Sequence, residues 1–326
     1  MGDCCVSPTA PVYRPPGLPG EAGPVSSQSC EGFFALFKLP GVSSASMLRV
    51  AKTILEADKA GFLGTLDVPA MGVLPVAVGS ATRLIPFLPS TDKEYVGELV
   101  LGMSTVTDDM YGEPTERHGA QGISEEALRS AAEAVAAQSE QVPPHVSAKR
   151  QKGVRGYDAV RGEGRLIEFR PVPVSVRSLA LLRSMHDGDL RRVVFRMTVS
   201  PGFYVRGFCR DVGVVLGCGG CMGRLLRTRA HGFGVGDALT LEKLRQRVLA
   251  GDLTFLRAGD TSPALLGGLP WISLDAVQWR DFCHGLAVSW EKASEATVLV
   301  RRPDGCAGGV AGIRDGKAWP LRVFIA

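Results

Sequence analysis

A single acid lies within a long uncharged stretch of this chain. Between residues 60 and 82, Asp67 is the only Asp, Glu, Lys or Arg, and the apolar run 73–78 follows it. Gly64 before the acid and Gly72 after it predict a loop at this point. On local sequence alone, an Asx-turn or a helix cap is the favoured interpretation of such an acid. The alternative is a carboxylate held in a poorly solvated pocket, where it can act as a nucleophile or a base.

Length and composition bound the architecture. With 326 residues, 45% of them hydrophobic, the chain is long enough for one large domain and one small one. Residues 1–30 are rich in Pro, Gly and Ser and are predicted to form a disordered tail. Past Gly259 the composition changes to short strand-like pieces separated by turns. We therefore expect a large domain at 31–258 and a small one at 264–326.

Charge and cysteine content exclude several classes of protein. The formal charge of +4 is mildly basic, which permits an anionic partner without demanding one. Eight scattered cysteines do not form the pattern of a secreted disulfide framework. The sequence shows no signal peptide and no apolar run of transmembrane length. These features predict a soluble cytoplasmic protein without a membrane partner.

Hydrophobic periodicity places the main elements. Helices are predicted at 46–60, capped by Ser44 or Ser46 and ended by Gly61, and at 124–138. Apolar runs and alternating patterns predict strands at 32–37, 94–101, 192–199, 271–272, 296–300, 309–313 and 321–325.

A basic, glycine-bearing tract follows the second predicted helix. Only three acids accompany its seven cations, which are Lys149, Arg150, Lys152, Arg155, Arg161, Arg165 and Arg170. A solvated surface would explain part of this excess. The tract also suits a loop that follows the phosphates of an RNA backbone.

The whole segment 61–82 resembles the hallmark of the TruB family of tRNA pseudouridine synthases, which has the form GHTGTLDPxAxGxLPxxxGxAT. The segment reads GFLGTLDVPAMGVLPVAVGSAT, so Phe62 and Leu63 replace the usual His and Thr. The resemblance continues in blocks to nearly the last residue. Further blocks that resemble the family are 38–44, 93–95, 141–149, 200–211, 224–229 and 232–241.

The resemblance implies an α+β pseudouridine synthase fold, with a mixed, largely antiparallel sheet flanked by helices. It also implies a small C-terminal PUA-like β-barrel, which is an RNA-binding module, and an RNA-gripping loop at about 120–160 of the catalytic domain. The implied activity is isomerisation of the uridine at position 55 of the tRNA T-loop to pseudouridine. The implied partner is the T-arm of tRNA, bound by a monomer, and no cofactor, metal or nucleotide is required.

The resemblance also assigns the catalytic residues. Asp67 is implied to be the nucleophile or base that breaks the glycosidic bond, and Tyr204 helps to manage the C5 proton. Arg206 is implied to pair with the carboxylate and so keep it ionised and aimed. The alternative interpretation of Arg206 is a surface cation.

Substrate-binding residues follow in the same way. Tyr95 and Leu225 are implied to replace the stacking that the extruded base loses, although a strand aromatic and a helix-core leucine are the alternative interpretations. Phe62 is expected to offer a stacking face to the RNA, or else to pack in the core. A set of three basic residues is expected to contact RNA phosphates, namely Lys149, Arg150 and Lys152.

Cys218 and Cys221 have the C-x-x-C spacing of redox or zinc sites. A structural zinc needs two more ligands in a comparable knuckle, and none is evident in the sequence. We interpret the motif as a Gly-rich turn between two helices.

Two other functional classes compete with the synthase. One is a tRNA-binding chaperone without turnover, and the other is a guide-RNA-dependent synthase subunit of the related box H/ACA particle. The presence of Asp67, Tyr95, Tyr204 and Arg206 argues against the first. The strongest blocks match the stand-alone enzymes, which argues against the second.

Overall fold

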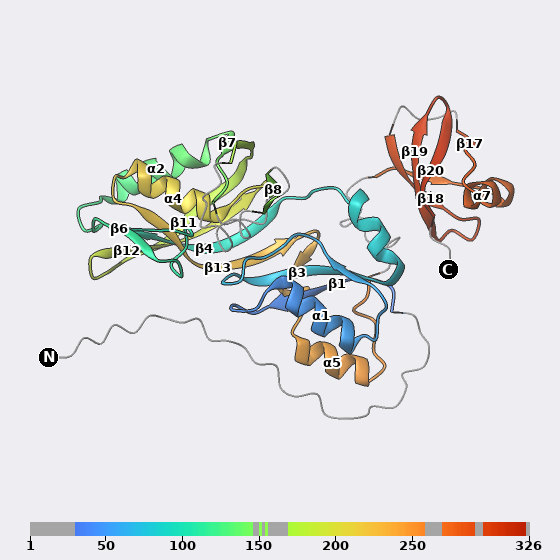
Figure 1. Ribbon diagram of the computed structural model, residues 1–326, viewed down its shortest axis with the longest axis horizontal. Coiled ribbons are helices and arrows are strands. Elements are labelled where there is room, and N and C mark those ends of the chain that lie inside the picture. Colours follow the sequence, from blue (N-terminus) through green and yellow to red (C-terminus); the bar gives the residue numbers. More distant parts are fainter. Residues whose placement is uncertain are drawn as a thin grey trace.

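The computed structural model describes residues 30–145, 150–151, 154–155, 169–257, 269–290 and 296–323. Nine strands of this described part form one sheet, with the central order β11-β12-β4-β13-β3-β1-β15 (Figure 1). Its strands are β1 (Gly32–Lys38), β2 (Ala60–Phe62), β3 (Met71–Val78), β4 (Lys93–Leu101), β11 (Val176–Asp187), β12 (Leu190–Val199), β13 (Gly220–Ala230), β14 (Phe233–Gly234) and β15 (Ala238–Leu239). Only the pairs β1–β15 and β13–β3 are parallel. The predicted mixed, largely antiparallel sheet is therefore confirmed.

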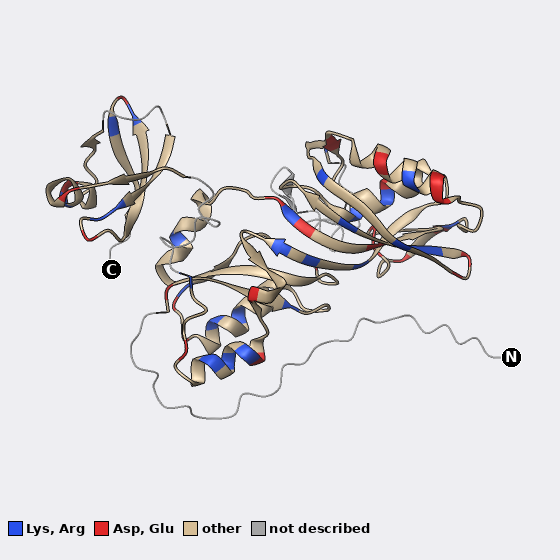
Figure 2. Cartoon of the chain, turned by 180° about the vertical axis from the view of Figure 1, so that it is seen from behind, with Lys and Arg blue, Asp and Glu red and all other residues tan. Residues whose placement is uncertain are grey.

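Two helix pairs cover the two halves of this sheet. Helices α1 (Ser44–Ile54) and α5 (Leu241–Leu249) pack against each other and against one face of β1 and β3. Helices α2 (Glu125–Ala136) and α4 (Val205–Val215) cover the half that contains β4, β11 and β12. Figure 1 shows the pairs on different halves of the sheet. Figure 2 shows that Lys and Arg gather on α1 and α5. The loop that carries Asp67 lies between these two halves.

The helix starts follow from local capping chemistry. The Ser124 side chain accepts a hydrogen bond from the amide of Ala127 at 3.1 Å and begins α2, as predicted. Helix α1 differs from its prediction of 46–60, because the Ser43 side chain accepts from the amide of Ser46 and caps the helix. Such a cap contributes about 1 kcal/mol. The helix ends at Ile54 because residues 60–62 pair with β3 as strand β2 instead.

A second sheet lies in the C-terminal part of the chain, with the order β16-β18-β19-β20-β17. Its elements are β16 (Trp271–Ser273), α7 (Ala276–Cys283), β17 (Val288–Ser289), β18 (Ala296–Arg301), β19 (Ala307–Arg314) and β20 (Lys317–Val323). The predicted strands at 271–272, 296–300 and 309–313 are confirmed. Strand β20 begins earlier than predicted because Asp315 and Gly316, with φ of 49° and 68°, form a tight two-residue hairpin turn.

This C-terminal sheet is a half-barrel in the described residues, because its two edge strands, β16 and β17, do not pair with each other. The closed PUA-like barrel is thus not confirmed. Leu299 and Val310 of this sheet pack in one cluster with Phe33, Val73 and Leu84. Leu84 belongs to the 3-10 helix η1 (Gly79–Phe87), which therefore lies between the two sheets. Among the described residues, no helix is long and apolar enough to span a membrane.

Several predictions concern residues outside the described ranges. The predicted tail of residues 1–30 lies outside them except for Cys30, and the expected domain boundary after residue 258 falls in the undescribed segment 258–268. The expected RNA-gripping loop at about 120–160 contains α2 and β7 (Glu140–Gln141). Beyond residue 145, that loop is described only at the short strands β8 (Arg150–Gln151) and β9 (Val154–Arg155). Both domain limits stay predictions.

Candidate active site

A pocket of about 270 Å³ opens between the two halves of the large sheet. Its wall comes from the loop before β3, the start of β4, the start of α4 and the middle of β13. The side chains that line it include three of the predicted catalytic residues and two of the predicted substrate-binding ones: Asp67, Tyr204, Arg206, Tyr95 and Leu225. The structure therefore brings together residues that lie up to 158 positions apart in the sequence.

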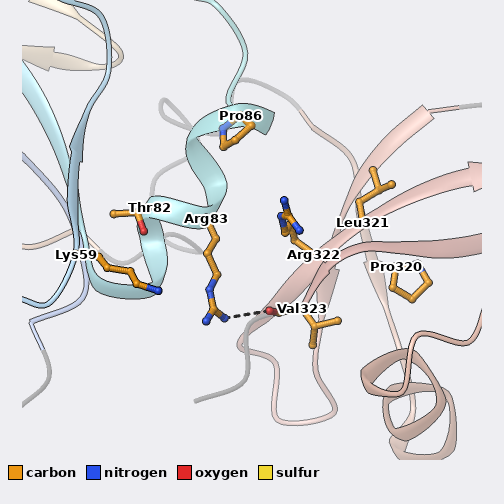
Figure 3. A pocket seen from close by; sticks show the side chains of 8 residues that line it. All are labelled: Lys59, Thr82, Arg83, Pro86, Pro320, Leu321, Arg322 and Val323. Carbon is orange, nitrogen blue, oxygen red and sulfur yellow. Dashed lines mark hydrogen bonds between the residues drawn. The ribbon is translucent and has the colours of Figure 1, made fainter.

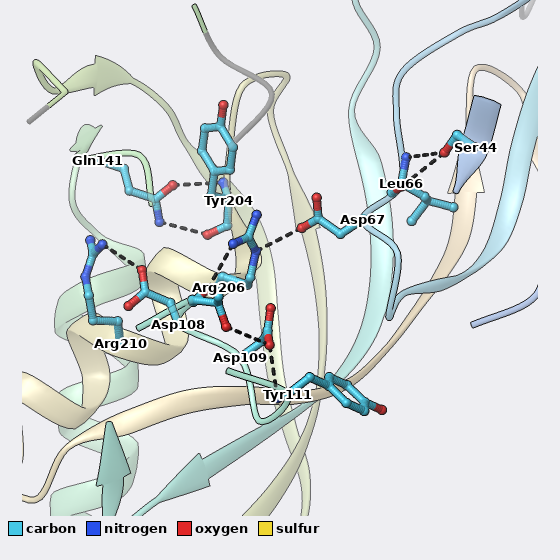
Figure 4. A network of polar contacts seen from close by, with 11 residues as sticks. Ser44, Leu66, Asp67, Asp108, Asp109, Tyr111, Gln141, Tyr204, Arg206 and Arg210 are labelled. Atoms are coloured by element: carbon cyan, nitrogen blue, oxygen red, sulfur yellow. Dashed lines mark hydrogen bonds and ion pairs between the residues drawn. The ribbon is translucent and has the colours of Figure 1, made fainter. Parts of the chain in front are cut away.

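Asp67 is held by Arg206. The guanidinium Nε donates to the Asp67 carboxylate Oδ2 at 2.9 Å, and Nη1 donates to the backbone oxygen of Thr107 at 2.9 Å (Figure 4). Only 3% of the Arg206 side chain is exposed, against 28% for Asp67. A buried cation thus fixes a carboxylate that still reaches the pocket. The predicted pairing is confirmed, and the interpretation of Arg206 as a surface cation is wrong.

Lys38 and Ser44, which precede the loop in the sequence, hold the backbone on either side of Asp67. The Ser44 hydroxyl donates to the carbonyl of Leu66 and accepts from its amide, both at 3.0 Å. The Lys38 ammonium donates to the carbonyls of Val68 at 3.1 Å and Ala70 at 2.6 Å. Burial lowers the pKa of Lys38 to about 8, although the Asp67 carboxylate opposes that shift. The loop backbone is therefore fixed by side chains from β1 and α1.

Arg227 on β13 holds the other end of the same loop. Its fully buried guanidinium donates to the carbonyls of Gly64 at 3.1 Å, Thr65 at 3.2 Å and Val73 at 2.8 Å. The Cβ of any other residue at Gly72 would lie 2.2 Å from the backbone oxygen of Arg227, so this close approach of β3 and β13 requires glycine there. Hydrogen bonds from a charged donor are each worth about 1.5–3 kcal/mol. Arg227, like Lys38 and Ser44, was not identified from the sequence.

Tyr204 is positioned by a second residue that sequence reasoning did not assign a role. The Gln141 amide donates to the Tyr204 carbonyl at 3.0 Å and accepts from the Tyr204 backbone amide at 2.8 Å (Figure 4). Gln141 itself is buried. Tyr204 is the N-cap residue of α4, so this contact fixes the point from which Arg206 extends. The only signal in the sequence was that Gln141 opens one of the blocks shared with the family.

Tyr95 and Leu225 form the apolar side of the pocket. They lie on neighbouring strands, where Gly97 pairs with Leu225 and Tyr95 pairs with Arg227. Tyr95 is 8% exposed and belongs to the main core cluster as well as to the pocket wall. Burial raises the pKa of the Tyr95 hydroxyl, which keeps it neutral beside Arg227. Leu225 lies on strand β13, so the interpretation as helix core is wrong.

Two further carboxylates form a layer behind Arg206. Asp109 accepts hydrogen bonds from the Thr107 hydroxyl at 2.9 Å and the Tyr111 amide at 3.0 Å, while Asp108 pairs with Arg210 at 3.1 Å. Burial raises the pKa of both carboxyls. Thr107 also supplies the carbonyl that Arg206 binds, so this layer sets the position of the guanidinium. A Thr-Asp-Asp sequence between two short strands could have indicated it.

Lys93 also lines the pocket, at the first position of β4. Burial lowers the pKa of its ammonium, and the nearby Arg227 lowers it further. Among the described residues no carboxylate lies within ion-pair distance of Lys93. Its position predicts contact with an anionic or carbonyl group of whatever fills the pocket.

The remaining predicted substrate residues lie elsewhere. Phe62 on β2 packs against the hydrophobic cluster beneath α1 and α5 and is not among the residues that line the pocket. This placement favours the core-packing alternative. Lys149 and Lys152 lie outside the described residues, and of Arg150 only the backbone is described, in β8. Their contact with RNA stays a prediction.

The Cys218–Cys221 motif joins a helix to a strand, not two helices as predicted. It connects α4 to β13, and a Cβ at Gly213 would lie 2.1 Å from the backbone nitrogen of Gly220, so glycines permit the close packing there. Cys218 and Cys221 pack in different hydrophobic clusters. Burial raises the pKa of the Cys221 thiol to about 12. In the described part of the chain, no three His, Cys, Asp or Glu residues could hold a metal ion together.

Comparison with solved structures identifies the fold. A chain of the Cbf5–Nop10–Gar1 complex superposes with a TM-score of 0.64 at 22% identity, covering 91% of this chain and 84% of that one. A chain of the archaeal box H/ACA Nop10–Cbf5 complex gives a TM-score of 0.62 at 23% identity, covering 93% and 88%. At these identities the likeness establishes a shared fold.

Comparison of sequences identifies the family. The TruB family pseudouridylate synthase model, for the N-terminal domain, matches residues 52–205. The tRNA pseudouridine synthase B of Moorella thermoacetica is 37% identical over 258 residues, which are 79% of this chain and 83% of that protein. The protein of the same name from Trichormus variabilis is 32% identical, covering 90% of this chain and 98% of its own length.

The fold and the sequence relatives define an isomerase of the pseudouridine synthase class. The chain belongs to the TruB family of pseudouridylate synthases.

Proposed function

We propose that this enzyme converts the uridine at position 55 of the tRNA T-loop to pseudouridine. The relatives that match most of the chain are named tRNA pseudouridine synthases. The observation that carries the proposal is the Asp67 carboxylate, which is partly exposed to the pocket and bound at 2.9 Å by an almost fully buried arginine. A carboxylate fixed in this way is suited to nucleophilic or base catalysis without reorganisation.

Entry of the base requires that it leave the folded T-loop. A uracil enclosed in a stacked RNA loop must be extruded, which costs a few kcal/mol in lost stacking and pairing. Tyr95 and Leu225 form the apolar wall beside Asp67 and would replace part of that stacking. Lys93 at the same wall would bind a phosphate of the extruded nucleotide.

The reaction is an internal rearrangement in which atoms balance without an outside reagent. The bond between N1 of uracil and C1′ of ribose breaks, the uracil turns, and a bond forms between C5 and C1′. The proton on C5 is lost and N1 gains one. Asp67 would start this sequence either by attacking C1′ or by removing a sugar proton, and Tyr204 would help to manage the C5 proton.

Replacing the carboxylate tests the assignment. Asp67→Asn is expected to abolish formation of pseudouridine in a T-arm transcript, while the Kd for the RNA stays within a few-fold because remote basic residues dominate binding. Tritium release or mass spectrometry measures turnover, and filter binding measures Kd. Asp58→Asn, at an exposed position, is the matched control. Substantial turnover by Asp67→Asn would remove Asp67 from the mechanism.

The same assay separates the competing functions. A tRNA-binding chaperone would give no pseudouridine with the wild-type chain, and a guide-dependent subunit would give none unless a guide RNA was added. Turnover of the transcript by the purified chain alone excludes both. We also propose that the enzyme works as a cytoplasmic monomer and that its C-terminal sheet belongs to a PUA-like RNA-binding domain.

A further inference from the structure

A second pocket lies at the joint between the large sheet and the C-terminal sheet. It has a volume of about 490 Å³. Helix η1 and the residue before β2 form one wall, and the end of β20 forms the other (Figure 3). The residues that line it are Lys59, Thr82, Arg83, Pro86, Pro320, Leu321, Arg322 and Val323. Neither sheet makes this pocket alone.

Of the described residues that line this pocket, three are cations and none is a carboxylate. Lys59, Arg83 and Arg322 are all exposed, and among the described residues none of them takes part in an ion pair. The nearby acid Glu31 does not line the pocket and accepts a hydrogen bond from the Ser80 hydroxyl at 2.8 Å. The Arg83 Nη1 donates to the Val323 carbonyl at 3.2 Å, which links the two walls. Figure 3 shows the Arg83 and Arg322 side chains extending into the space between the walls.

We propose that this pocket, here called the joint pocket, binds a phosphate of the tRNA backbone at a point remote from the reacting uridine. Three positive charges around one cavity repel each other, and an anion between them removes that repulsion. A small free anion would gain little at such exposed side chains, since salt screens them. A polyanion gains more, because each phosphate contact releases condensed counterions from the nucleic acid.

The joint pocket and the active site lie at opposite ends of β3. Asp67 precedes the first residue of β3, and η1 begins directly after its last. The eight residues of this strand span about 25 Å at 3.3 Å per residue. The nucleotide that reacts at Asp67 therefore does not supply the phosphate. This proposal rests on the proposed function, and it concerns RNA that continues beyond the T-arm.

Charge reversal of two pocket residues tests the proposal. Lys59→Glu combined with Arg322→Glu spares Arg83, whose hydrogen bond links the walls. The matched control is Arg49→Glu combined with Lys317→Glu, two exposed cations outside the pocket that change the net charge equally. Both variants and the wild type are assayed on full-length tRNA and on a T-arm transcript. We expect the ratio of kcat/KM for tRNA to that for the T-arm to fall in the pocket variant only.

Salt dependence gives a second readout. Each phosphate contact contributes a slope of about +0.9 to log Kd against log salt, so its loss removes about a 3.5-fold weakening between 50 and 200 mM salt. We expect this flattening for full-length tRNA and not for the T-arm. A neutral pair, Lys59→Gln with Arg322→Gln, should show the same direction with less risk to folding.

Three outcomes would overturn the assignment. An unchanged ratio in the neutral pair would mean that tRNA does not reach the pocket. An equal fall in pocket and control variants would mean a long-range effect of net charge. Inorganic phosphate that binds the wild type but not the pocket variant, without any effect on tRNA, would assign the pocket to a free anion. Turnover of the T-arm by the wild type checks the proposed function separately.

Discussion

Replacement of Gln141 by leucine is expected to slow catalysis even though Gln141 does not line the pocket. Its amide group makes two hydrogen bonds to the backbone of Tyr204, at 2.8 and 3.0 Å. The Tyr204 carbonyl also accepts from the amide of Phe208 at 3.2 Å and keeps that partner in the variant. The loss therefore falls mainly on the Tyr204 amide. A buried donor without a partner costs about 1–3 kcal/mol.

This cost should appear in both stability and rate. A loss of about 2 kcal/mol lowers the Tm of a domain of this size by about 4–8 °C. Because Arg206 lies two residues after Tyr204, a shift of about 1 Å at the helix start would lower kcat by up to about 100-fold. Gln138→Leu, an exposed glutamine just past the end of α2, is the matched control and should change neither quantity. An unchanged kcat in a destabilised Gln141→Leu enzyme would refute the positioning role.

Gln141→Glu distinguishes a positioning role of Gln141 from a purely structural one. An ionised glutamate can accept from the Tyr204 amide, but its second oxygen would face the Tyr204 carbonyl and repel it. A protonated glutamate donates to that carbonyl and restores both bonds. The pKa of the introduced carboxyl should therefore rise, and the kcat of the variant relative to wild type should increase as the pH is lowered from 8 to 5. A flat ratio across this range would contradict the geometry.

Two other substitutions separate binding from packing. Lys93→Met should lower kcat/KM about 10- to 100-fold, because it removes a charged contact to the substrate phosphate. It should not lower Tm, because the ammonium is buried at a cost that already lowers its pKa. A lowered Tm with unchanged kcat/KM would make Lys93 structural. Phe62→Ala should destabilise the fold by about 2 kcal/mol, roughly half the cost for a fully buried phenylalanine, and leave kcat of the folded enzyme unchanged, since Phe62 packs in the core cluster. A larger loss of turnover in Phe62→Ala than in Phe62→His would instead restore the stacking role.

The sequence predicted the elements that follow a periodic hydrophobic pattern and the residues that belong to a known motif. The helix after Ser124 and the alternating strand that ends at Val199 follow from periodicity, and the structure confirms both. The pairing of Asp67 with Arg206 was expected from two separate motif matches, and it is present at 2.9 Å. Strand β13 was missed because its burial depends on the two neighbours β3 and β4, not on a local pattern.

Contacts to backbone carbonyls were the part of the site that the sequence could not reveal. Every residue carries a backbone carbonyl. A lysine, a serine or an arginine that binds such a carbonyl therefore sets no requirement on the type of the partner residue. Arg227 reaches Gly64 across 163 positions, and Lys38 reaches Ala70 across 32. The joint pocket is similar, because Arg322 and Lys59 line one pocket only when the two sheets pack together. Such sites depend on tertiary packing alone.

One of the three side chains that hold the Asp67 loop comes from a strand far along the sequence. The loop carbonyls are bound by Lys38 at the end of β1, Ser44 at the start of α1 and Arg227 near the end of β13. The bonds from Lys38 and Ser44 span no more than 32 positions, whereas those from Arg227 need β13 beside β3, a closure of more than 150 residues that costs chain entropy. Arg227 therefore ties the loop that carries Asp67 to β13. Packing defects along β13 should for that reason lower activity before they unfold the helices that cover the sheet.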